Sequence, residues 1–264
     1  MSLSIAPLFS SSSGNCTFIC SEKCSLLVDA GLAGKYIEQA LSAIGRSPAE
    51  LSAILVTHEH MDHIKGVGVL SRRYGIPVYA NEETWGEMEG KIGPIPLKNM
   101  RVIDENDFFL SDICVTPIPI SHDAARPFGY SFVCGKPKIS ILTDTGKFTR
   151  EMLCALGGSN IVMLEANHDV DMLKNGSYPY RLKKRILSTH GHLSNDDAGT
   201  AAVSLAERGT KGIILAHLSK ENNEESIAYG TVSQSLTAAG IVPAKDIALK
   251  TTKKYQVTGL YTLK

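Results

Sequence analysis

Short apolar runs alternate along the chain with segments that carry apolar residues at helical spacing. Many of the runs are rich in β-branched residues and end at turn residues, which is typical of buried strands. The predicted strands are Cys16–Cys20, Ser25–Asp29, Ala53–Thr57, Val78–Ala80, Ile113–Ile120, Tyr130–Cys134, Lys138–Thr143, Asn160–Glu165, Gly212–Ala216 and Gln256–Leu263. The predicted helices are Lys35–Ile44, His63–Tyr74, Glu82–Glu89, Phe148–Leu156, Tyr180–Leu187, Asn195–Arg208 and Glu224–Ala239. This order predicts two sheets in contact, covered on the outside by helices.

The composition is that of an ordinary globular protein. Of the 264 residues, 43% are apolar and 20% are charged, and no repeat, low-complexity tract or linker interrupts them. We therefore predict one domain over residues 1–264. Lys+Arg and Asp+Glu both number 27, so a net charge of zero gives no global attraction to nucleic acid or to an anionic membrane. A local basic patch would still suffice for either.

The cysteines and the N-terminus bear on the compartment. Cys16, Cys20 and Cys24 are regularly spaced, but no second pair lies nearby, which favours reduced thiols over a zinc knuckle. The first residues lack the basic and long apolar segments of a signal peptide. No apolar stretch approaches the roughly 20 residues of a membrane helix. These features predict a cytoplasmic protein with no membrane partner.

Several predicted strands end in a histidine or an aspartate. These residues are Asp29 after LLV, His58 after ILVT, His122 after PIPIS, Asp144 after SILT and His217 after IILA. Strand ends that share one edge of an α/β structure are where functional sites are usually assembled. One such residue means little, but a series of them is hard to explain by core packing.

The segment His58–His63 is the most informative part of the sequence. His58 and His60 stand at i and i+2 in an expected loop and can face one ion, while Asp62 and His63 can face a neighbouring one. Imidazole and carboxylate together suit Zn(II), Mn(II) or Fe(II). The segment is not the H-E-x-x-H motif of zincins, because position 62 is an aspartate. The alternative is a loop that is rich in histidine by chance.

The segment resembles the H-x-H-x-D-H signature of the metallo-β-lactamase superfamily, whose other motifs occur here in the expected order. The resemblance implies an α+β fold, namely a four-layer αβ/βα sandwich with two divalent metal ions at one edge of the sheets. It implies that Asp29 orients the histidine loop without binding metal. The implied ligands are His58, His60 and His122 for the first metal, Asp62, His63 and His217 for the second, and Asp144 as the bridge.

A metal pair of this kind has a definite chemistry. Two cations about 3.5–4 Å apart can share a water and lower its pKa towards roughly 7, which gives a metal-bridging hydroxide at neutral pH. The same pair neutralises charge that develops on a phosphoryl or acyl oxygen. Near the position of the bridging carboxylate, which is Asp144 here, secreted β-lactamases of the best-known class use a cysteine. Its absence, with the absence of a signal peptide, argues against antibiotic hydrolysis.

Two polar segments could contact a substrate. Ser10–Asn15 is expected to be a loop between strands, and Ser13 and Asn15 are candidate phosphate contacts; the alternative is a simple hairpin loop. The segment GHLSND opens a predicted helix, with Ser194 as a candidate N-cap and substrate contact. A helix N-terminus beside His192 is a candidate anion site, and a capping-loop histidine is the alternative.

A basic run lies between His168 and His192. The sequence YRLKKR places four cations within five residues, and we expect Arg181 and Lys184 to contact a nucleic-acid backbone. The alternative is a solvated helix face, which is the commoner meaning of such a run.

The segments SSSSGN, LEANHD, YPYRLKKRI and GHLSNDDA together resemble the YycJ-like (WalJ) branch of the superfamily, which is similar to tRNase Z and other nucleic-acid phosphodiesterases. The resemblance implies a dinuclear phosphodiesterase or nuclease, acting as a 5′-to-3′ exonuclease on DNA rather than on RNA. Asp62, His168 and His192 would then be catalytic. The short interval between Asp144 and His217 leaves no room for the inserted cap domain of β-CASP nucleases.

Two other functions are compatible with these motifs. A hydrolase of a small thioester, lactone or cyclic phosphodiester would use the same metals, and an enclosed pocket rather than an open basic groove would favour it. A regulatory binding protein would retain the fold without catalysis, although the complete ligand set argues against it. Zn(II) is the expected metal, with Mn(II) and Fe(II) as alternatives. The sequence predicts no particular oligomeric state.

Overall fold

Two seven-stranded sheets lie face to face in the computed structural model, which describes residues 1–254 and 256–264. The first sheet consists, in spatial order, of β14 (Tyr261–Leu263), β1 (Leu3–Ser11), β2 (Gly14–Cys20), β3 (Ser25–Val28), β4 (Ala53–Leu55), β5 (Val78–Ala80) and β6 (Met100–Val102). The second consists of β13 (Ala248–Thr251), β12 (Gly212–Ala216), β11 (Ile161–Glu165), β10 (Lys138–Leu142), β9 (Phe128–Val133), β8 (Ile113–Pro119) and β7 (Phe108–Leu110).

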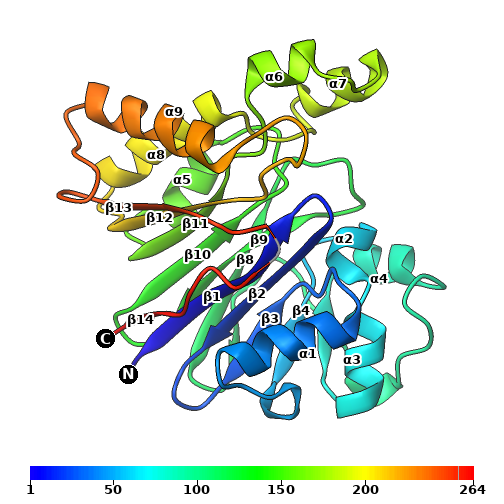
Figure 1. The fold of residues 1–264 in the computed structure, drawn as a ribbon. Helices are drawn as coiled ribbons and strands as arrows, with labels where there is room; N and C mark the ends of the chain where they lie inside the picture. The colour runs from blue at the N-terminus through cyan, green and yellow to red at the C-terminus, as the bar shows by residue number, and fades with distance from the viewer. Residues whose placement is uncertain (255) are drawn as a thin grey trace.

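Helices cover the outer face of each sheet, as Figure 1 shows. Those on the side of the first sheet are α1 (Gly34–Ala43), α3 (Val67–Tyr74) and α4 (Glu82–Met88), with the short α2 (Met61–Ile64) at its edge. Those on the second are α5 (Arg150–Leu156), α8 (Asn195–Glu207) and α9 (Glu225–Ala238). Single 3-10 turns occur at Pro48–Glu50 and Leu97–Asn99. The predicted four-layer αβ/βα sandwich is confirmed.

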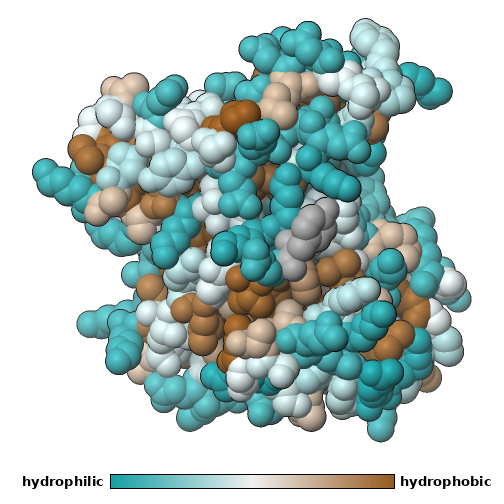
Figure 2. Space-filling model, viewed as in Figure 1, coloured by the Kyte–Doolittle hydropathy of each residue, from teal (hydrophilic) through white to brown (hydrophobic). Residues whose placement is uncertain are grey.

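Two further helices, α6 (Val170–Asn175) and α7 (Tyr180–Ile186), project from the helical layer of the second sheet. The surface of this projection is largely hydrophilic, as Figure 2 shows by its teal and pale side chains. Within the described part of the chain, none of the helices combines the length and the apolarity that crossing a bilayer requires.

The core forms three apolar layers, because most strands are buried on both faces. Successive side chains of a strand point to opposite faces. Phe18 and Ile54 accordingly pack under the helices of the first sheet, while the next residues, Ile19 and Leu55, pack between the sheets. The third layer lies between the second sheet and helices α5, α8 and α9. Burial on both faces explains why the strands read as continuous apolar runs.

Parallel pairing brings the carboxyl ends of strands together. In the first sheet β3, β4 and β5 are parallel neighbours, and in the second β10, β11 and β12 are. The segments that follow β3, β4, β10 and β12 contain the strand-end histidines and aspartates of the sequence. The topology therefore gathers these residues at one edge of the sandwich.

The expectation of a polar loop over Ser10–Asn15 is wrong in its extent. Strand β1 continues through Ser11 and β2 begins at Gly14, which leaves only Ser12 and Ser13 in the turn. The cause is a polar contact between the sheets, because the buried Ser10 Oγ accepts a hydrogen bond of 2.8 Å from the His217 backbone N–H. A serine-rich segment can thus form strand when neighbouring backbone satisfies its hydroxyls.

The predicted helix His63–Tyr74 is two helices. Helix α2 begins at Met61 and ends at Ile64, and α3 begins at Val67. The chain passes between them at Gly66, whose N–H donates to the Ala30 carbonyl at 2.7 Å. A Cβ at this glycine would lie 2.3 Å from the Leu32 carbonyl oxygen, so only glycine allows the approach. The predicted strand Gln256–Leu263 also shortens to β14.

Gly31→Ala tests how tightly the segment after β3 is pressed against α2. A Cβ at Gly31 would meet the Asp62 carbonyl oxygen at 1.6 Å and the Asn15 nitrogen at 2.7 Å. We expect the free energy of unfolding to fall by about 2 kcal/mol or more, measured by urea denaturation. Gly230→Ala in α9 is the control, since open space surrounds it and it should stabilise by about 0.5–1 kcal/mol. Equal stability of the two variants would contradict this packing.

Candidate metal centre

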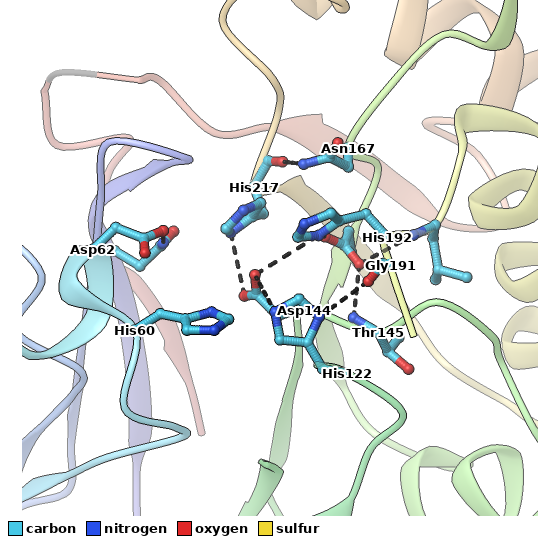
Figure 3. Close-up of polar contacts among 12 residues, drawn as sticks. His60, Asp62, His122, Asp144, Thr145, Asn167, Gly191, His192 and His217 are labelled. Atoms are coloured by element: carbon cyan, nitrogen blue, oxygen red, sulfur yellow. Dashed lines mark hydrogen bonds and ion pairs between the residues drawn. The ribbon is translucent and has the colours of Figure 1, made fainter. Parts of the chain in front are cut away.

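Three strand-end residues adopt the left-handed backbone conformation that L-residues rarely take. The φ angles are 61° at Asp29, 59° at Asp144 and 56° at His217. Such a conformation costs on the order of 1–3 kcal/mol per residue and is concentrated at functional sites. Each turns the chain sharply just after its strand, so that side chains from both sheets face one common space, as Figure 3 shows.

The histidines expected at the first metal lie together. One ring nitrogen from each of His58, His60 and His122 lies within 4.8 Å of the other two, and His58 Nε2 lies 3.0 Å from His60 Nδ1. The outer nitrogens of two of these rings are anchored: His122 Nδ1 donates to the Gly191 carbonyl at 3.1 Å, and His58 Nδ1 pairs with Thr57 Oγ1 at 3.0 Å. This anchoring leaves the Nε2 atoms directed at the shared space.

Asp144 lies between this group and a second one. His63 Nε2 is 3.5 Å from Asp144 Oδ2 and 3.5 Å from Asp62 Oδ2. His217 Nδ1 is 3.3 Å from Asp144 Oδ2, and His122 Nε2 is 4.0 Å from Asp144 Oδ1. The structure therefore brings together all seven residues that the sequence analysis expected as ligands, with Asp144 in contact with both groups.

Asp29 holds the histidine loop from behind. Its carboxylate accepts hydrogen bonds from the Thr57 N–H, the Thr57 hydroxyl and His63 Nδ1, each at 2.8 Å. The group is buried, so these bonds exchange little with water. Because Nδ1 of His63 is occupied in this way, its Nε2 faces Asp62 and Asp144.

The charges of the cluster shift the pKa of its members in opposite directions. Burial lowers the pKa of His63, but the carboxylates of Asp144, Asp29 and Asp62 outweigh burial and raise it well above its usual value. Burial raises the pKa of Asp144, yet the histidines around it, led by His217, hold it well below its usual value. The carboxylate of Asp144 is thus ionised at neutral pH, as binding of a cation requires.

The donor set fits divalent metal ions. Among the described residues, Asp144 Oδ2 and His217 Nδ1 are buried and have no hydrogen-bond partner. Buried polar atoms without partners cost free energy, on the order of 1–3 kcal/mol each. Imidazole nitrogens and carboxylate oxygens that converge in this way are the ligands that Zn(II), Mn(II) and Fe(II) take in proteins.

Glu165 is a member of the site that the sequence analysis did not single out. Its fully buried carboxylate accepts hydrogen bonds from His192 Nδ1 at 2.8 Å, Thr145 N–H at 2.9 Å and Leu193 N–H at 3.2 Å. Burial lowers the pKa of His192, but Glu165 outweighs burial and raises it to about 8. Glu165 ends the apolar strand β11, so the strand-end pattern that indicated Asp29 and His217 could have found it.

Other residues expected near the substrate lie in different settings. His168 is buried beneath the start of α8, and neither of its ring nitrogens has a partner among the described residues; burial lowers its pKa to about 4. The Ser194 hydroxyl caps α8 and bonds to Asp197 Oδ2 at 2.7 Å. Ser13 is exposed in the β1–β2 turn, whereas Asn15 is buried beside His63.

Helix α7 contains the basic run and reaches the rim of the candidate metal centre. Arg181 and Lys184 are exposed on this helix. Arg185, in its last turn, pairs through two nitrogens with the carboxylate of Asp123. Asp123 Oδ1 in turn lies 3.4 Å from His122 Nε2. The cations of α7 therefore begin directly beside the histidine cluster.

Comparison with known proteins agrees with this geometry. Residues 25–217 match the family model described as a beta-lactamase superfamily domain. The chain is 44% identical over 241 residues to the exodeoxyribonuclease YycJ of Bacillus anthracis, covering 91% of each protein. It is 42% identical over 256 residues to the exodeoxyribonuclease WalJ of Streptococcus pneumoniae, covering 96% of this chain and 95% of that protein.

Among solved structures, the metallo-β-lactamase fold protein YhfI of Bacillus subtilis aligns with a TM-score of 0.75 at 15% identity, over 99% of this chain and 100% of that one. At this identity the likeness concerns the fold alone. The family match and the two relatives place the chain in the metallo-β-lactamase superfamily. Within it, the chain is a YycJ/WalJ-like member, as the sequence motifs predicted.

Glu165→Gln tests whether Glu165 controls the charge of His192. A glutamine can accept the two backbone N–H bonds through its oxygen, but its NH₂ group then faces His192 Nδ1 and offers no negative charge. In the metal-free protein we expect the pKa of His192 to fall well below about 8, because the charge and the hydrogen bond of Glu165 are lost and Asp144 is left as the carboxylate that opposes burial. NMR titration of the histidine ring resonances measures this.

Glu207→Gln, an exposed change at the end of α8, is the matched control and should leave the titration of His192 unchanged. An unchanged pKa of His192 in Glu165→Gln would show that this pair does not set its protonation.

Proposed function

We propose that the protein is a dinuclear metal-dependent nuclease that hydrolyses phosphodiester bonds of DNA. The observation that carries this proposal is the convergence of the histidine and aspartate donors with His192, which Glu165 holds alongside them. The similarity, over most of the chain, to proteins named exodeoxyribonuclease supports DNA as the substrate.

The proposed ligands follow the two groups around Asp144. The first cation would be held by three imidazoles and the second by a mixture of imidazole and carboxylate, with Asp144 between them. Zn(II) is the expected occupant, because nitrogen-rich sites of this kind bind it well. The proposed ligands are His58, His60 and His122 for the first cation, Asp62, His63 and His217 for the second, and Asp144 as the bridge.

The side chains around the cations have separable roles in the proposed reaction. When bound, the cations would activate water and neutralise negative charge on the phosphate. Asp62, whose side chain is 27% exposed, can accept a hydrogen bond from the attacking water and orient it. His192 has its Nδ1 engaged by Glu165, so its Nε2 can donate a proton to the leaving oxygen. A catalytic role for His168 stays a prediction.

Helix α7 offers a surface for a nucleic-acid strand. Tyr180, Lys174 and Lys184 line a groove of about 530 Å³, and the ring of Tyr180 is 79% exposed. Cations that track a backbone beside an aromatic ring on which a base can stack are typical of single-strand binding. Arg181 and Arg185, one turn apart, would extend this surface to the rim of the metal centre. Ser13 and Ser194 are also proposed to contact the nucleic-acid substrate.

The small-molecule alternative has less support. The apolar groove beside α4 has a volume of about 690 Å³ and is lined by Trp85 and Met88 but by none of the proposed ligands. A second groove, of about 670 Å³, is lined by His122 but by no other proposed ligand.

The proposed nuclease acts from the 5′ end of DNA, and its proposed location is the cytoplasm. The cysteines are free thiols in the structure, which suits a reducing compartment.

Metal removal and His192→Ala test the proposed activity. Chelation should abolish hydrolysis of labelled DNA, and Mn(II) or Zn(II) should restore it. His192→Ala should lower kcat by about 10²–10⁴-fold with little change in KM, because a proton donor acts in the chemical step. With DNA labelled at one end or the other, the label that is released first shows the direction of degradation. RNA and small phosphodiesters are assayed in parallel.

His190→Ala, an exposed histidine two positions away, is the control and should leave kcat unchanged. A protein that holds both metals and cleaves no phosphodiester would refute the nuclease. Turnover confined to small esters or lactones would favour the alternative.

The Arg181→Gln/Lys184→Gln double variant tests the α7 surface. We expect a higher KM for oligonucleotides and a salt dependence of binding weaker by about 2 in log–log slope, since each phosphate contact contributes about one. Hydrolysis of a small phosphodiester should not change. The double variant Lys23→Gln/Lys35→Gln removes two exposed cations on the side of the first sheet and is the matched control. Equal effects of the two double variants would exclude a specific role for α7.

A further inference from the structure

Asn15 contacts the candidate metal centre directly. Its Nδ2 lies 3.0 Å from His63 Nε2 and 3.3 Å from Asp62 Oδ2. These are the atoms of His63 and Asp62 that face the second cation in the proposed assignment. The sequence analysis expected Asn15 to contact substrate, but a side chain only 7% exposed between two proposed ligands is better placed to contact the cation itself.

Backbone contacts hold the main chain at Asn15 close to the candidate metal centre. Its carbonyl oxygen accepts a hydrogen bond of 2.8 Å from the Gly31 N–H, and Gly31 is pressed against the Asp62 backbone so closely that no Cβ fits between them. Strand β2, the turn after β3 and helix α2 therefore meet at one point. The Cα of Asn15 is therefore held beside Asp62 and His63, within reach of its amide.

The amide has an unused oxygen. Asn15 Oδ1 is buried and accepts no hydrogen bond from any residue that the structure describes. A primary amide can present either its nitrogen or its oxygen to a neighbour by rotation of about 180° around its terminal bond. The nitrogen suits the acceptor oxygen of Asp62, but an amide nitrogen is no metal ligand, so a cation between Asp62 and His63 favours the oxygen.

We propose that Asn15 Oδ1 is an additional ligand of the second cation. This inference rests on the cation pair of the proposed function and extends its donor set. The second site then offers three oxygens, from Asp62, Asp144 and Asn15, and two imidazole nitrogens. The first site offers three imidazoles and Asp144.

The difference between the two sites bears on metal choice. Carboxylate and carbonyl oxygens suit Mn(II), which accepts higher coordination numbers, whereas four-coordinate, nitrogen-rich sites suit Zn(II). The ratio of Mn(II) affinity to Zn(II) affinity should therefore be higher at the second site than at the first. Asn15 is the residue that produces much of this difference.

Metal binding by Asn15 variants tests the proposal without relying on turnover. Metal-free wild type, Asn15→Ala, Asn15→Asp and Ser12→Ala are titrated with Mn(II), with free Mn(II) followed by electron paramagnetic resonance, and again after one equivalent of Zn(II). We expect Asn15→Ala to weaken one of two Mn(II) sites by about 10- to 100-fold and to leave the other unchanged. Ser12→Ala, an exposed change in the same turn, should bind as wild type does.

Asn15→Asp separates a ligand from a mere hydrogen-bond donor. An aspartate keeps a ligand oxygen, so Mn(II) binding should be retained or tightened. If Asn15 only donated to Asp62, the aspartate would repel Asp62 and weaken binding as the alanine does, which would overturn the proposal. Thermal melting with Mn(II) present checks that each variant is folded.

The outcomes also separate this inference from the nuclease proposal. Unchanged Mn(II) binding in Asn15→Ala overturns the role of Asn15, even if DNA is hydrolysed. The expected pattern of binding in a protein that cleaves no phosphodiester supports Asn15 and refutes the nuclease. A wild-type protein that binds no divalent metal overturns both.

Discussion

The burial of imidazole and carboxylate groups against one another, at the edge where two sheets meet, is the constraint on which the rest of the structure depends. Asp144 and His217 are almost inaccessible to water, and each has a polar side-chain atom without a hydrogen-bond partner within the described chain. Such groups are costly in an apolar interior unless a partner satisfies them. Divalent cations supply that partner, so the same feature that destabilises the metal-free protein gives the site its affinity.

The fold maintains this arrangement through close backbone contacts and anchored side chains. Asp29, Asp144 and His217 turn the chain in left-handed conformations after their strands, and Gly31 and Gly66 allow the segments around α2 to approach the first sheet. The Nδ1 atoms of His58, His63 and His122 are bound by Thr57, Asp29 and the Gly191 carbonyl, which orients these three rings. The contacts that stabilise the fold therefore also orient these three rings without a bound cation.

The sequence predicted the layers of the fold and the convergence of the expected metal ligands, because both depend on strand periodicity and on residues at strand ends. It missed features that depend on contacts between distant segments. The bond of Ser10 to the backbone of His217 extends β1, the approach of Gly66 divides a helix, and Glu165 gains its role only beside His192. Such pairings cannot be predicted from a local sequence pattern. For Glu165, its position at the end of an apolar strand did indicate a site residue.

Anomalous diffraction from crystals grown with Zn(II) and Mn(II), recorded at both metal edges, tests the central claim most directly. The account predicts two peaks on either side of Asp144, one enclosed by His58, His60 and His122 and the other near Asp62, His63 and His217. The absence of any anomalous peak at this edge of the sheets in crystals grown with both metals would contradict the account. Peaks found only elsewhere in the protein would contradict it as well.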